Sequence, residues 1–210
     1  MATQPPSGAK TKLFAAAVAV IRAKGYSAAT VDDICRAAGV TKGAFYHHFA
    51  GKDKLAVAAA AHFAAVADGL FSAAPYHDLP DPLDRLLGYV DFRKALMQDD
   101  LPDITYLLGT MVQETYERHP RIREACDKHL GDHTAMVATD IAAAIDKHGI
   151  AAVWSAESLA LYTQTVVQGA FIFVKAQHGL DAAVVCLDHL RRYLEMLFHR
   201  TPGYALVRRL

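Results

Sequence analysis

The chain has 210 residues, of which 53% are hydrophobic and 21% are charged, a composition that excludes a disordered or low-complexity chain. Three Cys are too few for a disulfide framework, so we expect a reducing compartment, the cytoplasm. The net charge of zero conceals an asymmetry, because residues 1–54 carry +5 and the rest of the chain carries −5. Chance clustering of charges can produce this asymmetry. A basic N-terminal segment on an otherwise acidic chain is also typical of nucleic-acid-binding proteins.

No apolar stretch predicts a membrane segment. The N-terminal run ending at Ile21 is followed by Arg22 and Lys24, where a signal peptide needs a neutral cleavage site. Residues 55–67 are too short to cross a bilayer, and polar side chains interrupt residues 159–176. We therefore expect a soluble protein without a membrane partner.

Helical periodicity dominates the N-terminal region, and no convincing strand alternation occurs anywhere. Apolar residues spaced three and four apart predict a first helix that ends at Gly25, a residue suited to a left-handed C-cap. Thr30 is a good N-cap for a second helix, which ends at Gly39. Thr41 is expected to cap a third, short helix with two phenylalanines on one face.

A fourth helix is expected to start near Gly51 and to run through Val66, before a proline-rich loop over residues 72–82. Five further helices are expected over residues 83–97, 103–117, 121–148, 155–177 and 181–199. About nine helices without a sheet predict an all-α fold.

The second and third helices are joined by a four-residue link that contains Gly39. Two short amphipathic helices with such a link form a helix-turn-helix, which presents its second helix to the major groove of DNA. If Phe45 and Phe49 face inward, hydroxyl, ammonium, phenol and imidazole groups lie on the outer face of the third helix. That outer face consists of Thr41, Lys42, Gly43, Ala44, Tyr46 and His47.

The run TVDDICRAAGVTKGAFYHHF at residues 30–49, followed by Lys52 and Leu55, resembles the N-terminal domain of TetR-family transcriptional regulators. The resemblance covers about residues 10–56, and beyond them only the helical architecture is similar. It implies base contacts by Lys42, Gly43 and Ala44. It also implies phosphate contacts by Thr30, Thr41, Tyr46, His47, and Lys52 or its backbone amide. His48 is expected only to decorate the exposed helix.

The resemblance also implies a domain organisation. Residues 1–9 are expected to form a disordered arm, and residues 10–54 a three-helix helix-turn-helix DNA-binding domain. Residues 55–200 are expected to form a helical domain for effector binding and dimerisation, and residues 201–210 a frayed tail. The partners expected are a double-stranded DNA operator, a second copy of the chain and a small-molecule effector that relieves repression.

The last helix has an apolar seam with alternating spacings of three and four, and the preceding helix is apolar over a broad face. The two helices could complete a core within one chain. We favour a homodimer, because one recognition helix reads only a few base pairs and two-fold dimers read two half-sites. The predicted interface residues are Val166, Ala170, Leu187, Leu190, Leu194 and Leu197.

The middle helices are rich in aromatic and Met residues, most of which are expected to pack in the core. The resemblance implies that some of them line a cavity for a small, largely apolar effector, although no motif identifies the subset. The candidates are Phe63, Phe92, Met97, Tyr106, Met111, Trp154 and Tyr162.

Metal and redox sites are weaker interpretations. Cys126, His129 and His133 could share a helical face and hold Zn²⁺, but three ligands on one helix seldom complete a tetrahedron. The three cysteines, Cys35 included, are interpreted as small hydrophobic residues. We predict no metal, no cofactor and no enzymatic activity.

The alternative function is an all-α metal-dependent phosphohydrolase. His62 with His77 and Asp78 weakly resembles the ligand set of HD-type enzymes. The spacing disfavours this interpretation, because His77 and Asp78 lie in the proline-rich loop rather than on a helix. Such an enzyme would contain metal and turn over a substrate, whereas a regulator binds one short pseudo-palindrome in a salt-sensitive way.

Overall fold

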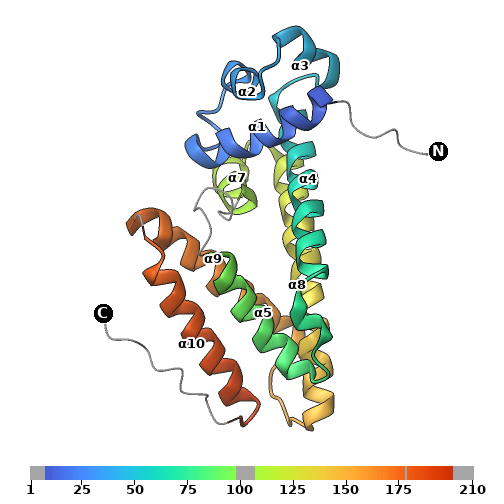
Figure 1. Cartoon of the computed structure of the whole chain (residues 1–210), viewed down its shortest axis with the longest axis vertical. Coiled ribbons are helices and arrows are strands. Elements are labelled where there is room, and N and C mark those ends of the chain that lie inside the picture. Colours follow the sequence, from blue (N-terminus) through green and yellow to red (C-terminus); the bar gives the residue numbers. More distant parts are fainter. Residues whose placement is uncertain (1–7, 98–106, 178, 201–210) are drawn as a thin grey trace, which may run out of the picture. The chain divides into compact units, whose positions relative to one another are not determined.

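The computed structural model describes residues 8–97, 107–177 and 179–200 (Figure 1). Within these ranges the chain forms nine α-helices, one short 3-10 helix and no strand, which confirms the predicted all-α fold. The helices are α1 (Gly8–Lys24), α2 (Val31–Ala38), α3 (Lys42–His48), α4 (Lys52–Ser72), η1 (Pro75–Asp78), α5 (Pro82–Leu96), α7 (Leu107–Thr115), α8 (Pro120–His148), α9 (Ala156–Gln177) and α10 (Asp181–Leu197). Residues 1–7 of the predicted arm, the predicted tail and Tyr106 lie outside the described residues.

Contacts divide the chain into two compact units. Unit 1 comprises residues 1–73 and 100–133, and therefore contains α1–α4, α7 and the first half of α8. Unit 2 comprises residues 74–99 and 134–210, with η1, α5, the second half of α8, α9 and α10. Contacts thus group α7 with the N-terminal helices, while the functional boundary after residue 54 stays a prediction.

The predicted caps of α2 and α3 are present. The Thr30 hydroxyl accepts a hydrogen bond from the Asp33 N–H (3.1 Å), and the Asp33 carboxylate accepts one from the Thr30 N–H (3.2 Å). This reciprocal capping box satisfies two N–H groups that the first turn leaves open. Gly39 ends α2 with φ of +64°, and the Thr41 hydroxyl caps α3 by accepting from the Ala44 N–H (3.2 Å). Short-range chemistry therefore sets both ends of the helix-turn-helix.

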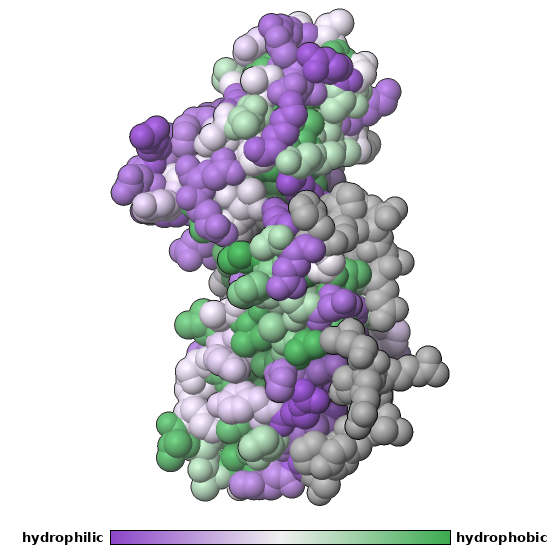
Figure 2. All heavy atoms as spheres, turned by 90° about the vertical axis from the view of Figure 1, so that its left-hand side faces the viewer, coloured by the Kyte–Doolittle hydropathy of each residue, from purple (hydrophilic) through white to green (hydrophobic). Residues whose placement is uncertain are grey.

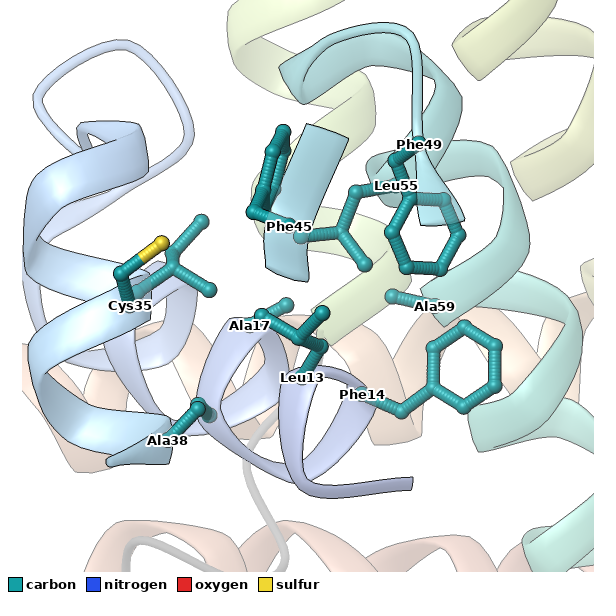
Figure 3. Packing of buried hydrophobic residues seen from close by; sticks show 11 residues of the cluster. Leu13, Phe14, Ala17, Cys35, Ala38, Phe45, Phe49, Leu55 and Ala59 are labelled. Carbon is teal, nitrogen blue, oxygen red and sulfur yellow. The ribbon is translucent and has the colours of Figure 1, made fainter. Parts of the chain in front are cut away.

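Two apolar clusters hold unit 1 together. The first joins α1–α4 around Leu13, Phe45 and Leu55, each with no exposed side-chain surface (Figure 3). Burying a side chain of this size stabilises the fold by about 1.5–3 kcal/mol. The second cluster joins α1 and α4 to α7 and α8, and includes Met111 and Ile122. The N-terminal helices are thus packed against one another on one side and against α7 and α8 on another.

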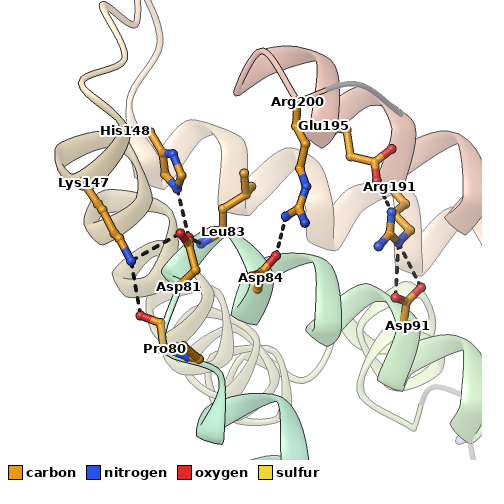
Figure 4. A network of polar contacts seen from close by, with 10 residues as sticks. All are labelled: Pro80, Asp81, Leu83, Asp84, Asp91, Lys147, His148, Arg191, Glu195 and Arg200. Atoms are coloured by element: carbon orange, nitrogen blue, oxygen red, sulfur yellow. Dashed lines mark hydrogen bonds and ion pairs between the residues drawn. The ribbon is translucent and has the colours of Figure 1, made fainter. Parts of the chain in front are cut away.

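Unit 2 is built on α9 and α10, which pack against each other, with α5 against α10. Ion pairs lie along the edges of these helices, among them Lys94–Asp188 (2.6 Å) and Arg85–Asp140 (2.7 Å). Figure 4 shows the network in which Asp81 caps α5 by accepting from the Leu83 N–H (2.8 Å). In the predicted loop the structure has the 3-10 turn η1, because Pro75 provides the φ angle that such a turn requires.

By length and hydropathy alone, Lys52–Asp78 and Ala156–Gln177 could cross a membrane. The first segment is longer than the apolar run expected from the sequence, because α4 continues to Ser72. Core helices of soluble proteins meet the same criterion, so the finding is weak evidence. Both segments contribute buried side chains to the units described above.

Candidate nucleic-acid interface

The outer face of α3 is the first candidate surface. Phe45 points into the cluster of unit 1 and is fully buried, whereas Tyr46, the next residue, is 57% exposed. Edge-on packing of Phe14 against Phe49, with ring centroids 5.7 Å apart, fixes the end of α3. The structure exposes five of the six predicted residues of the outer face and leaves Ala44 half-buried: Thr41, Lys42, Gly43, Tyr46 and His47 are exposed. The face is therefore open and rich in hydrogen-bond donors, as a groove-binding helix requires.

Lys42 forms an ion pair with Asp32 at the start of α2 (Nζ–Oδ1, 2.7 Å). The hydrogen bond and charge of Asp32 raise the pKa of Lys42, which keeps the ammonium protonated. Both side chains are more than half exposed, so the pair contributes no more than about 1 kcal/mol and is easily exchanged for another anion. Lys42 is thus held at the surface of the helix-turn-helix without being buried.

Thr30 has a hydroxyl that is engaged within the protein. It donates to Asp33 Oδ2 (2.8 Å) while it accepts from the Asp33 N–H. Hydrogen bonds from Thr30, together with the ammonium of Lys24 (3.0 Å), lower the pKa of Asp33 to about 2. A phosphate contact by Thr30 would therefore compete with Asp33 for the hydroxyl proton.

Lys52 has its side chain turned toward the protein. Its ammonium donates to the carbonyls of Tyr26 and Ala29 (2.9 Å each) and lies 4.3 Å from the centre of the Tyr26 ring. Gly51 is the N-cap of α4 and has no side chain to accept a hydrogen bond. The backbone N–H groups in the first turn of α4 therefore have no side-chain cap. The sequence left open whether the side chain of Lys52 or its backbone amide contacts a phosphate. This arrangement favours the amide, because the ammonium already has partners within the protein.

The predicted dimer interface lies largely inside a single chain in this structure. Four of its residues are buried inside a single chain, between α9 and the other helices of unit 2: Ala170, Leu187, Leu190 and Leu194. Val166 and Leu197 are half-buried. The apolar seam of α10 is therefore part of the core within one chain, which is one of the two arrangements that its sequence pattern allows, and these four side chains are not on the surface.

A different apolar face of α9 and α10 is exposed. The exposed residues are Leu161, Tyr162, Ile172 and Phe173 on α9, and Val185, Tyr193 and Met196 on α10. The rings of Tyr162 and Tyr193 lie edge-on, 5.3 Å apart between centroids, so the two exposed faces adjoin. Figure 2 shows the side of the molecule on which α10 lies, with hydrophobic side chains interspersed among hydrophilic ones. The signal in the sequence was that α9 is apolar on both sides, and such a helix needs two partners.

The predicted ligand-binding residues are divided between the two units. In unit 1, Met111 is fully buried and Phe63 packs against the apolar cluster that contains Met111. In unit 2, Met97 is buried, Phe92 and Trp154 are half-buried, and Tyr162 is 45% exposed on the apolar face described above. Their role in binding an effector stays a prediction.

Unit 2 contains a buried polar group that no pattern in the sequence indicates. The Gln164 amide donates to the hydroxyl of Tyr89 (2.6 Å), and both residues are at least 95% buried. Tyr76 packs edge-on against Tyr89, and its own buried hydroxyl has no hydrogen-bond partner among the described residues. Gly88 permits this close packing, because a Cβ there would lie 2.6 Å from that of Tyr76. Hydrogen-bonding groups inside an apolar unit are typical of sites that orient a small ligand.

The weaker metal candidates are not brought together. Over the described residues, no group of three or more His, Cys, Asp or Glu side chains is placed to hold a metal ion. Cys126 is fully buried, and burial raises the pKa of its thiol to about 12, so the reactive thiolate is scarce. Burial also raises the pKa of Cys35. The described residues therefore offer no support for the phosphohydrolase alternative.

Comparisons with known proteins agree with this architecture. Residues 13–59 match the family model described as bacterial regulatory proteins, tetR family. An uncharacterized HTH-type transcriptional regulator of Bacillus subtilis (strain 168), YvdT, is 34% identical over 129 residues, which are 61% of this chain. The match spans 56% of that relative, so the chain covers about half of the relative's length.

Solved structures share the fold at low sequence identity. The regulatory protein TetR from Rhodobacter sphaeroides superposes with a TM-score of 0.80 at 24% identity, over 89% of this chain and 99% of that one. A TetR-family regulator from Agrobacterium tumefaciens gives 0.78 at 19% identity, over 94% and 100% of the two chains. The reduced form of NemR from E. coli gives 0.73 at 20% identity, over 88% and 96%. These similarities extend the shared fold beyond the helix-turn-helix to most of the chain.

Proposed function

Because residues 13–59 match the model of the TetR family of bacterial regulatory proteins, we propose that the chain is a member of that family and acts as a cytoplasmic, DNA-binding transcriptional repressor rather than an enzyme. The observation that carries this proposal is the outer face of α3, where Lys42, Tyr46 and His47 are exposed on a helix anchored from behind by Phe45. In our proposal Lys42, Gly43 and Ala44 contact base edges. Phosphates are bound by Thr30, Thr41, Tyr46, His47 and the amide of Lys52.

Residues 10–54, which we call the reader, bind DNA in this proposal, and residues 55–200 bind a second chain and an effector. One reader covers few base pairs, so a dimer is needed for a specific operator. We place the dimer contact on the exposed apolar face of α9 and α10, because it is the part of these helices that the chain itself leaves uncovered. Exposed apolar side chains on adjoining helices, such as the Tyr162–Tyr193 pair, are typical of interaction sites.

The effector is proposed to be a small, largely apolar molecule that binds one conformer of the protein better than the other. Its differential affinity shifts the population away from the conformer whose readers match the operator. The aromatic and Met side chains of the helical domain support an apolar effector. The buried hydroxyls of Tyr76 and Tyr89 support one that also carries a hydrogen-bonding group.

Selection from random DNA duplexes tests the proposal. The full-length protein should enrich two similar half-sites whose centres lie about 10 base pairs, one helical turn, apart. Binding should weaken steeply with salt, because each neutralised phosphate releases counterions. A compound screen against the selected duplex then identifies the effector. Enrichment of no sequence would reject the proposal, and bound metal with turnover of a phosphoester would instead indicate the phosphohydrolase.

A further inference from the structure

Glu114, near the end of α7, binds the turn that follows α1. Its carboxylate accepts hydrogen bonds from the backbone N–H of Tyr26 (3.2 Å) and of Ser27 (2.7 Å). Gly25 makes this approach possible, because a Cβ at that position would lie 2.2 Å from Glu114 Oε1. Gly25 also has φ of +84°, which L side chains rarely adopt. Residues 88 apart in the sequence therefore meet beside a position whose positive φ favours glycine.

A second contact lies on the other side of Tyr26. The Tyr26 hydroxyl donates to one oxygen of Asp53, in the first turn of α4, and the other oxygen lies 3.1 Å from His119 Nδ1. His119 precedes α8, and its ring packs edge-on against Tyr26 with centroids 5.2 Å apart. Burial, followed by the hydrogen bond to Asp53, raises the pKa of Tyr26, so the phenol remains a proton donor.

The two contacts hold two parts of the reader. The turn gripped by Glu114 leads directly to Thr30, and Asp53 adjoins Lys52, whose amide we assign to a phosphate. Met111 of α7 packs in the same apolar cluster as Tyr26. Any displacement of α7 and the start of α8 must therefore either carry the α1–α2 turn along or break the hydrogen bonds of Glu114 and His119.

We propose that Glu114 and His119 form a latch that holds the reader in its DNA-binding conformation and that opens when repression is relieved. This inference rests on the proposed function. The latch consists of polar contacts at the edge of an apolar cluster, so it can open by local rearrangement while the two clusters of unit 1 stay folded. By thermodynamic reciprocity, if a closed latch favours DNA binding, bound DNA must favour the closed latch.

The first test replaces Glu114 by Gln in the full-length protein. The amide oxygen still accepts one hydrogen bond, but its NH₂ group faces the other backbone donor, so one bond is lost. The dissociation constant for the selected operator duplex should rise about tenfold, because only about a tenth of the molecules then hold the closed conformation. Glu117→Gln removes the same charge from an exposed side chain and is the matched control, with an expected change below about twofold.

The second test measures a quantity that a purely structural bond would not change. Hydrogen exchange of the Tyr26 and Ser27 amides is followed in the wild-type protein with and without the operator duplex. A latch predicts roughly tenfold slower exchange when the operator is bound, and little change with an unrelated duplex at the same concentration. In Glu114→Gln both amides should exchange faster than in the wild type without DNA.

The outcomes separate the latch from the proposed function. If the wild type selects no duplex, the function fails. If it selects one and Glu114→Gln binds it with unchanged affinity, or if bound operator leaves both amides unprotected, the latch is rejected and the repressor stands. An unfolded variant would be recognised by lost helicity. In that case Glu114→Asp, which keeps the charge but shortens the side chain, is tested for the same loss of affinity.

Discussion

At the scale of single residues, two lysines of the reader with the same formal charge have different surroundings. Lys42 is exposed and forms an ion pair with the exposed Asp32, whereas Lys52 donates to two backbone carbonyls of the turn after α1. An exposed ion pair is readily exchanged for a contact with DNA, while carbonyls of a partly buried turn need their donor. Replacement of Lys52 should therefore reduce the stability of the reader as well as its affinity.

Lys42→Ala should weaken operator binding by about 1–3 kcal/mol and relax specificity at one base pair if the ammonium reads a guanine edge. Asp32→Asn should have the opposite effect on affinity and tighten binding to all duplexes, because the substitution removes a negative charge and releases Lys42. Equilibrium titrations at several salt concentrations measure both effects. Unchanged affinity in Lys42→Ala would remove this residue from the interface.

At the scale of the element, α2 depends on the capping box between Thr30 and Asp33. The ionised carboxylate of Asp33 accepts from the Thr30 N–H and hydroxyl and pairs with Lys24, and its pKa is lowered from 3.8 to about 2. A lowered pKa in the folded state means that the contribution to stability is complete above the unfolded pKa of about 4. It is lost as the pH falls through about 2.

Between pH 5 and pH 2, the melting temperature of the wild type should therefore fall more than that of Asp33→Asn. At pH 5 the variant should have the lower melting temperature. The difference in melting temperature between the two proteins should narrow as Asp33 of the wild type becomes protonated. Thermal unfolding followed by circular dichroism at several pH values measures this. Asp127→Asn, an exposed change on α8, should parallel the wild type. A difference in melting temperature that stays constant from pH 5 to pH 2 would show that ionisation of Asp33 does not stabilise the folded state.

At the scale of the whole molecule, the exposed apolar face of α9 and α10 is the surface that we propose for dimerisation. Ile172 and Phe173 are each 54% exposed and Met196 is 65% exposed, although the other side of the same helices is buried within the chain. Covering these side chains in a second copy would remove their apolar surface from water at about 25 cal/mol per Å². The dimer that a two-half-site operator needs thus has an uncovered surface available.

Phe173→Glu should convert the dimer into a monomer, because the dimer would bury an unpaired carboxylate. Light scattering coupled to gel filtration measures the mass, and circular dichroism should show unchanged helicity. Val66→Glu is the control, since Val66 is similarly exposed at 59% but lies on α4. A dimeric Phe173→Glu protein would exclude this face. Leu190→Glu should instead unfold the chain, because Leu190 is 98% buried within it.

The amino-acid sequence by itself determined the all-α fold class and the caps of α2 and α3. Thr30, Gly39 and Thr41 act on backbone groups within one turn of their own positions, so their effect is visible in the local pattern. The resemblance of residues 10–56 likewise pointed to the helix-turn-helix, and residues 13–59 match the tetR family model. The inward position of Phe45 and the outward position of Tyr46 also followed from helical spacing alone.

Only the tertiary structure decided which partner each apolar or polar group meets. Periodicity shows that Leu187 and Leu194 belong to an apolar stripe, but a neighbouring helix of the same chain and a second chain would cover that stripe equally well. The contact of Glu114 with Tyr26 has no local signature either, because the two residues are brought together by the packing of α7 on α1. Local hydrogen bonds are encoded where they occur, whereas long-range contacts depend on how all the helices fill space together.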